Sequence, residues 1–125
     1  MRSRPRGGGP STSQGHPRAI FRRALEHENL LVAEATAREL GRISLGEALE
    51  LTLLIARKEP RRLPRVAARW LIRYLEERPQ ATIEEATMVA GCLGALGGDD
   101  HKEAVQTLRA VAERATRRAR DRGVA

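Results

Sequence analysis

The histidines are the residues of this chain best suited to acid–base or metal chemistry at neutral pH, and none lies in a pattern that supports it. His16 lies in a segment rich in glycine, serine and proline. His27 lies between two glutamates, but consecutive helical residues point about 100° apart, so these side chains do not converge on a metal unless the stretch forms a turn. His101 follows two aspartates at a predicted helix start, where acids serve as caps and meet the helix dipole. We predict no metal site.

The single cysteine and the paired glutamates also lack partners for catalysis. Cys92 is flanked by glycine and leucine in an apolar stretch with no neighbouring base, which predicts a buried, inert thiol. Two pairs of adjacent glutamates, at 76–77 and 84–85, fall at a predicted helix end and a predicted helix start, where solvated carboxylates are expected. The glycine triplet at 7–9 lacks the following lysine of a phosphate-binding loop. We therefore predict a protein that is not an enzyme and takes no cofactor.

Positive charge is the most informative feature of the sequence. The chain has 23 Lys and Arg against 16 Asp and Glu, a formal net charge of +7, and all but two of the cations are arginine. Four arginines between residues 57 and 73 are spaced to share one side of a helix: Arg62, Arg65, Arg69 and Arg73. This face is the predicted candidate site for a polyanion or a protein partner. The alternative is a solvated polar face in which Arg73 pairs with Glu77, four residues on.

The elements that position these side chains are predicted to be helices. Alanine, leucine, arginine and glutamate dominate, whereas β-branched and aromatic residues are scarce. The predicted loops are short, so successive helices are expected to pack as antiparallel neighbours. We predict an all-α fold of five or six antiparallel helices that forms a single domain over residues 18–122. Residues 1–17 contain no Leu, Ile, Val or Phe and are predicted to be a disordered basic tail.

Two predicted helices precede the basic face. The first covers residues 18–40, either as one rod or as two helices with Asn29 capping the second. The next begins at a capping box formed by Ser44 and Glu47 and runs to about Lys58. It is apolar on nearly every side in its second half, so we place it at the centre of the fold.

The third predicted helix carries the basic face on one side and the core on the other. It begins near Pro60 or Pro64 and ends before Pro79. Its apolar stripe has helical spacing and consists of Ala67, Trp70, Leu71, Tyr74 and Leu75. We predict Trp70 to be the largest single anchor of the core.

Two more helices are predicted after Pro79. The fourth lies in an acidic stretch of the chain, and the last extends into a basic stretch. A capping box of Thr82 and Glu85 opens the fourth helix, which ends at a glycine pair, 97–98. Gly91 and Gly94 inside it each disfavour the helix by up to about 1 kcal/mol, which predicts that a neighbouring helix approaches closely there. The last helix runs from residue 101 to about Arg120.

A weak internal repeat also bears on architecture. The capping box at Ser44 recurs at Thr82, 38 residues later, each time opening a buried helix. The segment PRVAARWL at residues 64–71 resembles the second helix of a HEAT repeat, in which Val-Arg or Arg-Val precedes small residues and a large apolar one. The resemblance implies stacked helical hairpins, arranged either as a compact bundle or as a short HEAT-like stack.

Together these features predict a non-catalytic, small helical protein-interaction module that presents a helix face to a protein partner. The alternative is a nucleic-acid-binding accessory protein that uses the arginine face of residues 62–73. Aromatic residues that could stack on RNA bases are missing, since Trp70 and Tyr74 share the core stripe. No apolar run approaches the roughly 18–20 residues of a membrane span, so we expect no membrane partner and a cytoplasmic location.

Overall fold

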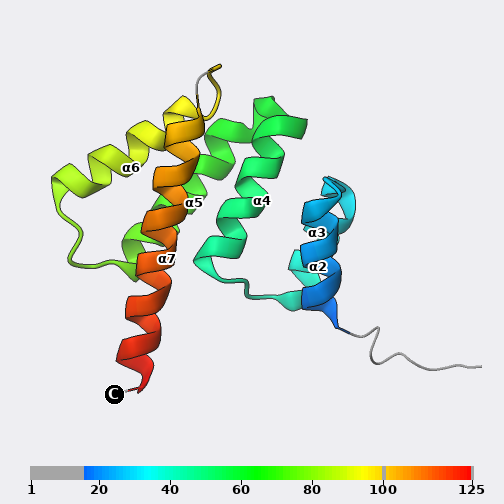
Figure 1. Cartoon of the computed structure of the whole chain (residues 1–125), viewed down its shortest axis with the longest axis horizontal. Helices are drawn as coiled ribbons and strands as arrows, with labels where there is room; N and C mark the ends of the chain where they lie inside the picture. Colours follow the sequence, from blue (N-terminus) through cyan, green and yellow to red (C-terminus); the bar gives the residue numbers. More distant parts are fainter. Residues whose placement is uncertain (1–15, 100, 125) are drawn as a thin grey trace, which may run out of the picture. The chain divides into compact units, whose positions relative to one another are not determined.

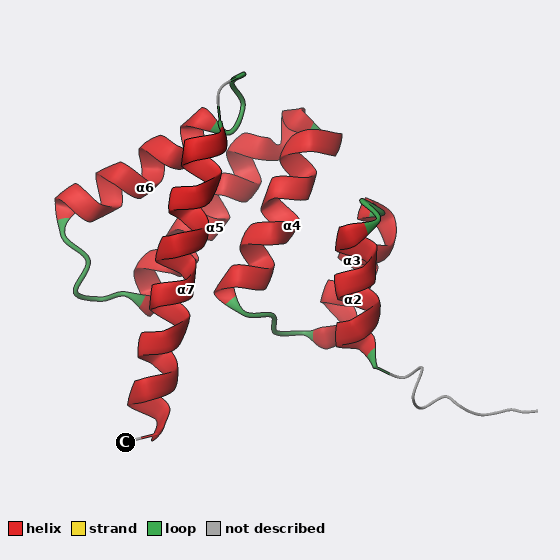
Figure 2. Ribbon diagram, viewed as in Figure 1, coloured by secondary structure: helices red, strands yellow, loops and turns green. Residues whose placement is uncertain are grey.

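The computed structural model describes residues 16–99 and 101–124, and these fold into α-helices without a β-strand. The predicted all-α fold, with six helices in the described residues, is confirmed (Figure 2). The helices are α2 (Pro17–Glu26), α3 (Leu30–Leu40), α4 (Leu45–Lys58), α5 (Leu63–Glu77), α6 (Ile83–Ala95) and α7 (Lys102–Val124), with the 3₁₀ turn η1 (Pro60–Arg62) between α4 and α5. The predicted basic tail lies outside the described residues except for its last two, and Pro17 already begins α2.

The described helices belong to two compact units. Helices α2 and α3 form unit 1, which ends at Ile43, and the remaining helices form unit 2, which begins at Ser44. The single domain over residues 18–122 stays a prediction, and each unit is described by itself. In unit 2, α4 packs against α5 and α7, while α6 packs against α5 and α7 and runs obliquely to them (Figure 1).

The two helices of unit 1 are separated by a turn at residues 27–29. The N–H of His27 donates to the Arg23 carbonyl, and Glu28 adopts a left-handed backbone conformation with φ of 56°. The Asn29 side chain then accepts a hydrogen bond from the N–H of Val32 at 3.2 Å, which caps α3. Of the two interpretations of residues 18–40, the broken helix with Asn29 as its cap is therefore the one observed.

Helix α4 begins with the capping box that the sequence predicts. The Ser44 hydroxyl accepts from the Glu47 N–H at 3.0 Å, and the Glu47 carboxylate accepts from the Ser44 N–H at 2.8 Å. Leu45, Leu49 and Leu54 are buried along the helix. Because α4 contacts α5, η1 and α7, its apolar surface is covered from several sides, as its composition predicts.

Both candidate prolines take part in opening the third predicted helix. Pro60 begins η1, and Pro64 lies in the first turn of α5, where the missing N–H removes no helical hydrogen bond. The prediction that Trp70 lies in the core is confirmed, since only 3% of it is exposed. Its indole N–H donates to the Leu45 carbonyl at 3.0 Å, and its ring stacks on Tyr74 with centroids 5.5 Å apart.

The prediction of a close helix contact at Gly91 and Gly94 is wrong. Both glycines are exposed, and a Cβ built on either would meet no atom within 4 Å. The packing of a neighbouring helix therefore does not require a glycine at either position. Cys92 is partly buried, and its Sγ lies 4.0 Å from the Met88 sulfur. Helix α7 extends a few residues beyond the predicted end at Arg120.

Among the described residues, no helix combines the length and the apolar character needed to cross a membrane.

Candidate functional site

The four arginines of the predicted basic face have different surroundings in the structure. At the end of η1, Arg62 forms an ion pair with Glu59 at 2.8 Å, and on α5 the predicted pair of Arg73 with Glu77 is present at 2.8 Å. Arg65 and Arg69 are exposed on α5 between them. The spacing therefore places the four side chains along one helix, but local acids engage two of them. Binding at this face stays a prediction.

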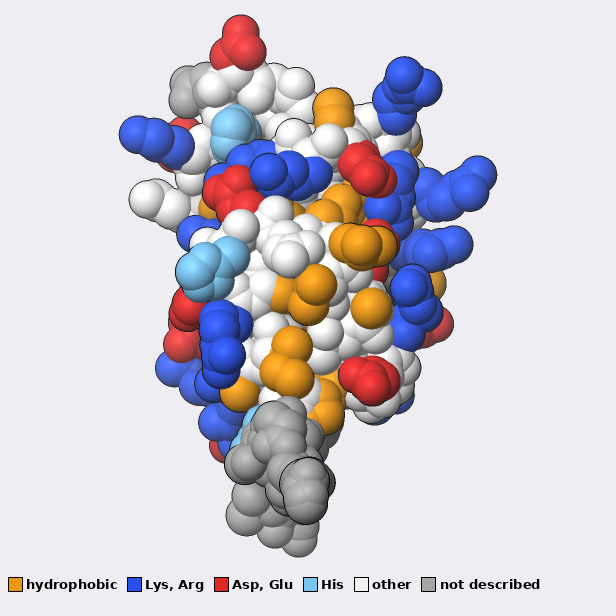
Figure 3. Space-filling model, turned by 90° about the vertical axis from the view of Figure 1, so that its right-hand side faces the viewer, with side chains coloured by type: hydrophobic (Ala, Val, Ile, Leu, Met, Phe, Trp, Pro, Cys, Tyr) orange, Lys and Arg blue, Asp and Glu red, His pale blue; other side chains and the backbone are white. Residues whose placement is uncertain are grey.

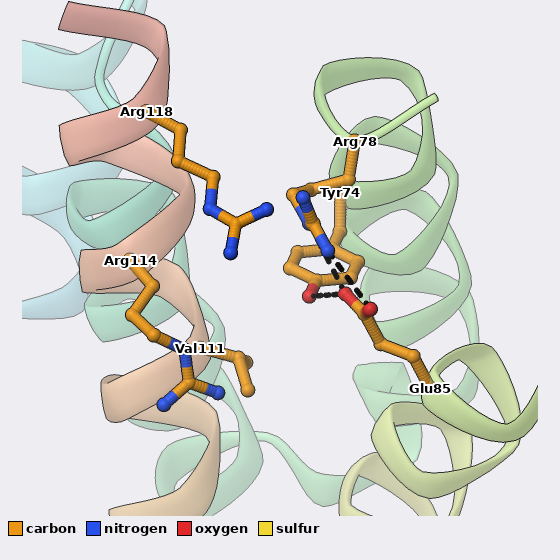
Figure 4. A pocket seen from close by; sticks show the side chains of 6 residues that line it. All are labelled: Tyr74, Arg78, Glu85, Val111, Arg114 and Arg118. Carbon is orange, nitrogen blue, oxygen red and sulfur yellow. Dashed lines mark hydrogen bonds and ion pairs between the residues drawn. The ribbon is translucent and has the colours of Figure 1, made fainter. Parts of the chain in front are cut away.

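A second group of arginines, outside the predicted basic face, surrounds a pocket of about 170 Å³ in unit 2. The end of α5, the first turn of α6 and the middle of α7 form its walls (Figure 4). The lining residues are Tyr74, Arg78, Glu85, Val111, Arg114 and Arg118. We call this the arginine pocket. Arg114 and Arg118 lie four residues apart, and this spacing brings both onto the same face of α7.

Glu85 is the centre of a hydrogen-bond network on one wall of the arginine pocket. The Arg78 guanidinium donates from Nη2 to Oε1 at 2.9 Å and from Nε to Oε2 at 3.1 Å. The Tyr74 hydroxyl also donates to Oε2. This two-pronged arginine–carboxylate contact is among the stronger and more directional hydrogen-bond arrangements in proteins. It fixes the Arg78 side chain, of which 11% is exposed, against the pocket wall.

The same network sets the protonation of its members. Hydrogen bonds from Arg78 and then Tyr74 lower the pKa of Glu85, and the positive charge of Arg118 adds to this effect. Burial raises the pKa of Tyr74, and its hydrogen bond to Glu85 raises it further. At neutral pH the pocket therefore contains an ionised Glu85, a neutral Tyr74 and charged arginines.

The network also changes the capping box predicted at the start of α6. The Thr82 hydroxyl accepts from the Glu85 N–H at 3.1 Å, so the first half of the box is present. The Glu85 side chain, however, bonds Arg78 and Tyr74, and only the Thr82 side chain caps the helix. A charged guanidinium is a stronger donor to a carboxylate than a backbone N–H, which explains the preference. The prediction that Glu84-Glu85 are simply solvated is thus wrong for Glu85.

Cationic groups in the arginine pocket outnumber the carboxylate. Three guanidiniums and one carboxylate line it, which gives a formal charge of +2 with Tyr74 neutral. Within residues 16–99 and 101–121, no carboxylate lies within ion-pair distance of Arg114 or Arg118. The Nη1 of Arg78 is buried and has no hydrogen-bond partner in the described part of the chain, a state that costs about 1–3 kcal/mol. The arrangement can therefore bind an anion.

The lining residues of this pocket come from distant parts of the sequence. One sequence feature could have indicated Arg78. This arginine directly follows one predicted helix, and the acid of the next helix's capping box, Glu85, comes soon after it in the chain. Nothing local indicates Arg114 or Arg118, because six arginines occur between residues 109 and 122 and only the packing of α7 selects two of them.

Unit 2 also has an apolar groove between α5 and α6. It encloses about 320 Å³ and is lined by Leu63, Pro64, Ala67, Ala68, Leu71, Ala90, Leu93 and Gly94. Two large apolar side chains on the same helices are exposed, Ile72 by 57% and Ile83 by 83%. Surface of this kind is typical of contacts with proteins.

Unit 1 has an exposed apolar surface of its own. Leu31 is 78% exposed, and Ile20 and Val32 are each 37% exposed. On the face shown in Figure 3, hydrophobic side chains gather along the middle. His27 does lie in a turn, but in the described part of the chain no cluster of three or more His, Cys, Asp or Glu side chains could hold a metal ion.

No family model, curated protein or solved structure matches this chain. The geometry of the chain itself is thus what indicates a function.

Proposed function

We propose that this chain is a non-catalytic protein-interaction module that binds an acidic segment of a partner protein at the arginine pocket. One observation carries the proposal: three guanidiniums and a single carboxylate line one hollow, and the buried Nη1 of Arg78 has no hydrogen-bond partner within the residues that the structure describes. An acidic group in the pocket would supply the missing acceptor and reduce the repulsion among the cations.

The chemistry of the pocket supports a binding role rather than a catalytic one. A general acid or base works best when its pKa lies near the working pH. Here the pKa of Glu85 is lowered and that of Tyr74 is raised, so both shifts lead away from neutrality. Each group is also engaged with the other by a hydrogen bond. The remaining polar lining consists of arginines, which serve as donors to anions and stay protonated.

The exposed apolar surface favours a protein over a nucleic acid as the partner. The groove between α5 and α6, with Ile72 and Ile83 exposed on the same helices, offers apolar area of the kind that protein interfaces cover. Nucleic-acid binding without sequence preference commonly uses aromatic side chains on which bases stack. Trp70 and Tyr74 are buried, so they are not accessible for stacking.

Binding of a polyanion by α5 is the second candidate function. Its support is that Arg65 and Arg69 are exposed one turn apart and have no ion-pair partner among the described residues. The two candidates use different arginines, and charge reversal at one site leaves the other intact.

The experiment that tests the proposal is a fluorescence-anisotropy titration of the full chain with a labelled polyglutamate peptide, with polylysine of equal length as the control probe. The charge reversal Arg114→Glu/Arg118→Glu should weaken polyglutamate binding more than about tenfold, because two attractions become repulsions. The matched control Arg65→Glu/Arg69→Glu changes the same number of charges on α5 and should alter affinity by no more than about twofold. If polyglutamate does not bind, or if only the α5 reversal abolishes binding, the proposal is wrong.

A further inference from the structure

We infer that the acidic group for which the arginine pocket is built is a phosphate monoester on a side chain of the partner protein, rather than a carboxylate. This inference rests on the proposed function and specifies the chemical group that the same site recognises. Three properties of the pocket carry it: its net charge, the directions from which its donors come, and its size.

The net charge of the pocket matches a doubly charged group. Glu85 neutralises one of the three guanidiniums, and the lining keeps a formal charge of +2. A phosphorylated side chain carries about −1.5 to −2 at pH 7. An aspartate or glutamate carries −1 and would leave one arginine uncompensated. A phosphodiester within a nucleic-acid chain also carries −1, and a sugar on each side of it would have to enter the pocket.

The donors come from two opposite walls. On one wall, Glu85 engages Nε and Nη2 of Arg78 and holds the side chain in place, while the buried Nη1 has no hydrogen-bond partner among the described residues. On the other wall, α7 contributes Arg114 and Arg118, and the Arg118 guanidinium extends across the pocket towards Arg78 and Tyr74 (Figure 4). A carboxylate is planar, and its two oxygens accept hydrogen bonds mainly within one plane. The three terminal oxygens of a phosphate monoester point in different directions and can accept from both walls.

The size of the pocket is consistent with this group. A water molecule in the liquid takes about 30 Å³, so a pocket of about 170 Å³ has room for a group of several heavy atoms. Glu85 and Tyr74 act here as positioning residues, because they hold Arg78 and need not contact the phosphate.

The test compares three degenerate peptide pools that differ at one fixed central position, which is serine, aspartate or phosphoserine. The pools are titrated into the full chain and binding is followed by anisotropy. Inorganic phosphate and a single-stranded oligonucleotide with a 5′-phosphate are used as competitors. We expect the phosphoserine pool to bind at least about tenfold more tightly than the aspartate pool, and the serine pool to bind most weakly. We also expect the phosphoserine pool to bind more tightly than either competitor.

Arg118→Gln should remove most of the preference for phosphoserine over aspartate, and Arg118→Lys should restore part of it, since a lysine keeps the charge but not the planar fork. The side chain at 118 is exposed, so neither variant should affect folding. The matched control Arg69→Gln should leave the preference unchanged.

Equal, pocket-dependent binding of the aspartate and phosphoserine pools would overturn this inference and leave the proposed function standing. If no pool and no polyglutamate binds, both fail. If inorganic phosphate or the 5′-phosphorylated oligonucleotide competes as tightly as the phosphoserine pool binds, the phosphate does not come from a protein side chain, and the inference is overturned.

Discussion

The guanidinium of Arg78 donates two hydrogen bonds to the carboxylate of Glu85, at 2.9 and 3.1 Å, and joins the end of α5 to the first turn of α6. Both residues lie close to the loop that connects these helices, so the contact ties the two ends of the loop together. The contact also aims Arg78 at the pocket. Stability and binding are therefore linked at Glu85.

Replacing the acid of this pair should destabilise the fold more than replacing the acid of an exposed pair. Glu85→Gln leaves Arg78 largely buried without its counter-charge and should lower the free energy of unfolding by about 1–3 kcal/mol. The control is Glu50→Gln, which breaks the more exposed pair with Arg109 and should cost no more than about 1 kcal/mol. Urea denaturation measures both. Equal losses would show that the Arg78–Glu85 contact contributes little beyond a surface pair.

Stability should also fall in acid through Glu85. Its pKa in the folded chain is lower than its ordinary value of 4.5, so the folded state holds this proton less readily than the unfolded state. The contribution to stability is then complete above about pH 4.5 and is lost as the pH falls through the lower folded-state pKa. Urea midpoints measured across this range should fall more steeply for the natural chain than for Glu85→Gln. Parallel curves would contradict the assignment.

The phenol of Tyr74 should titrate above the ordinary tyrosine value of 10.0, because burial and the bond to Glu85 both disfavour the phenolate. The chain has one tyrosine, so ultraviolet absorbance reports this group alone. Glu85→Gln removes the negative charge beside the phenol and should lower the midpoint relative to the natural chain. A midpoint that is unchanged in the variant would mean that burial alone sets the pKa.

Trp70→Ala should be the most destabilising substitution of the set, with a loss of about 3–5 kcal/mol, since it empties a buried site and removes the stack on Tyr74. Trp70→Phe retains a ring but removes the indole N–H that donates to the Leu45 carbonyl, and should cost less. The natural chain should show the blue-shifted fluorescence of a buried indole. An emission maximum typical of water, together with a near-neutral Trp70→Ala, would contradict the core position.

Titration with duplex DNA should separate the two candidate functions. If Arg62, Arg65, Arg69 and Arg73 all met phosphates, the logarithm of the affinity would fall with the logarithm of salt concentration with a slope of about −3.6. Two of them are already paired with acids, and we expect weak binding with a shallower slope. Arg65→Glu/Arg69→Glu should change this weak binding little. Tight binding that is lost on this reversal would favour the nucleic-acid function.

Local interactions made much of the fold predictable from the sequence. The box of Ser44 and Glu47 forms because both partners lie within one helical turn, and the same holds for the pair of Arg73 and Glu77. The stripe that contains Trp70 follows helical spacing: Ala67, Trp70 and Tyr74 are buried, and Leu71 and Leu75 are half-buried against the core. In each case the interacting groups are a few residues apart, so the helix itself brings them together.

Other features of the fold and the arginine pocket depend on tertiary structure alone. Sequence spacing does not show whether a side chain bonds a residue nearby in the chain or a distant one that packing brings close. Thr82 and Glu85 have the spacing of a complete capping box, yet the carboxylate turns to Arg78 once α5 and α6 pack together. Gly91 predicted a close helix contact, but none of the described helices approaches it closely. A glycine inside a helix looks the same in the sequence whether or not a neighbouring helix packs against it. The arginine pocket combines the end of α5 and the start of α6 with Arg114 and Arg118 on α7, and their convergence is set by how the helices pack rather than by any pattern along the chain.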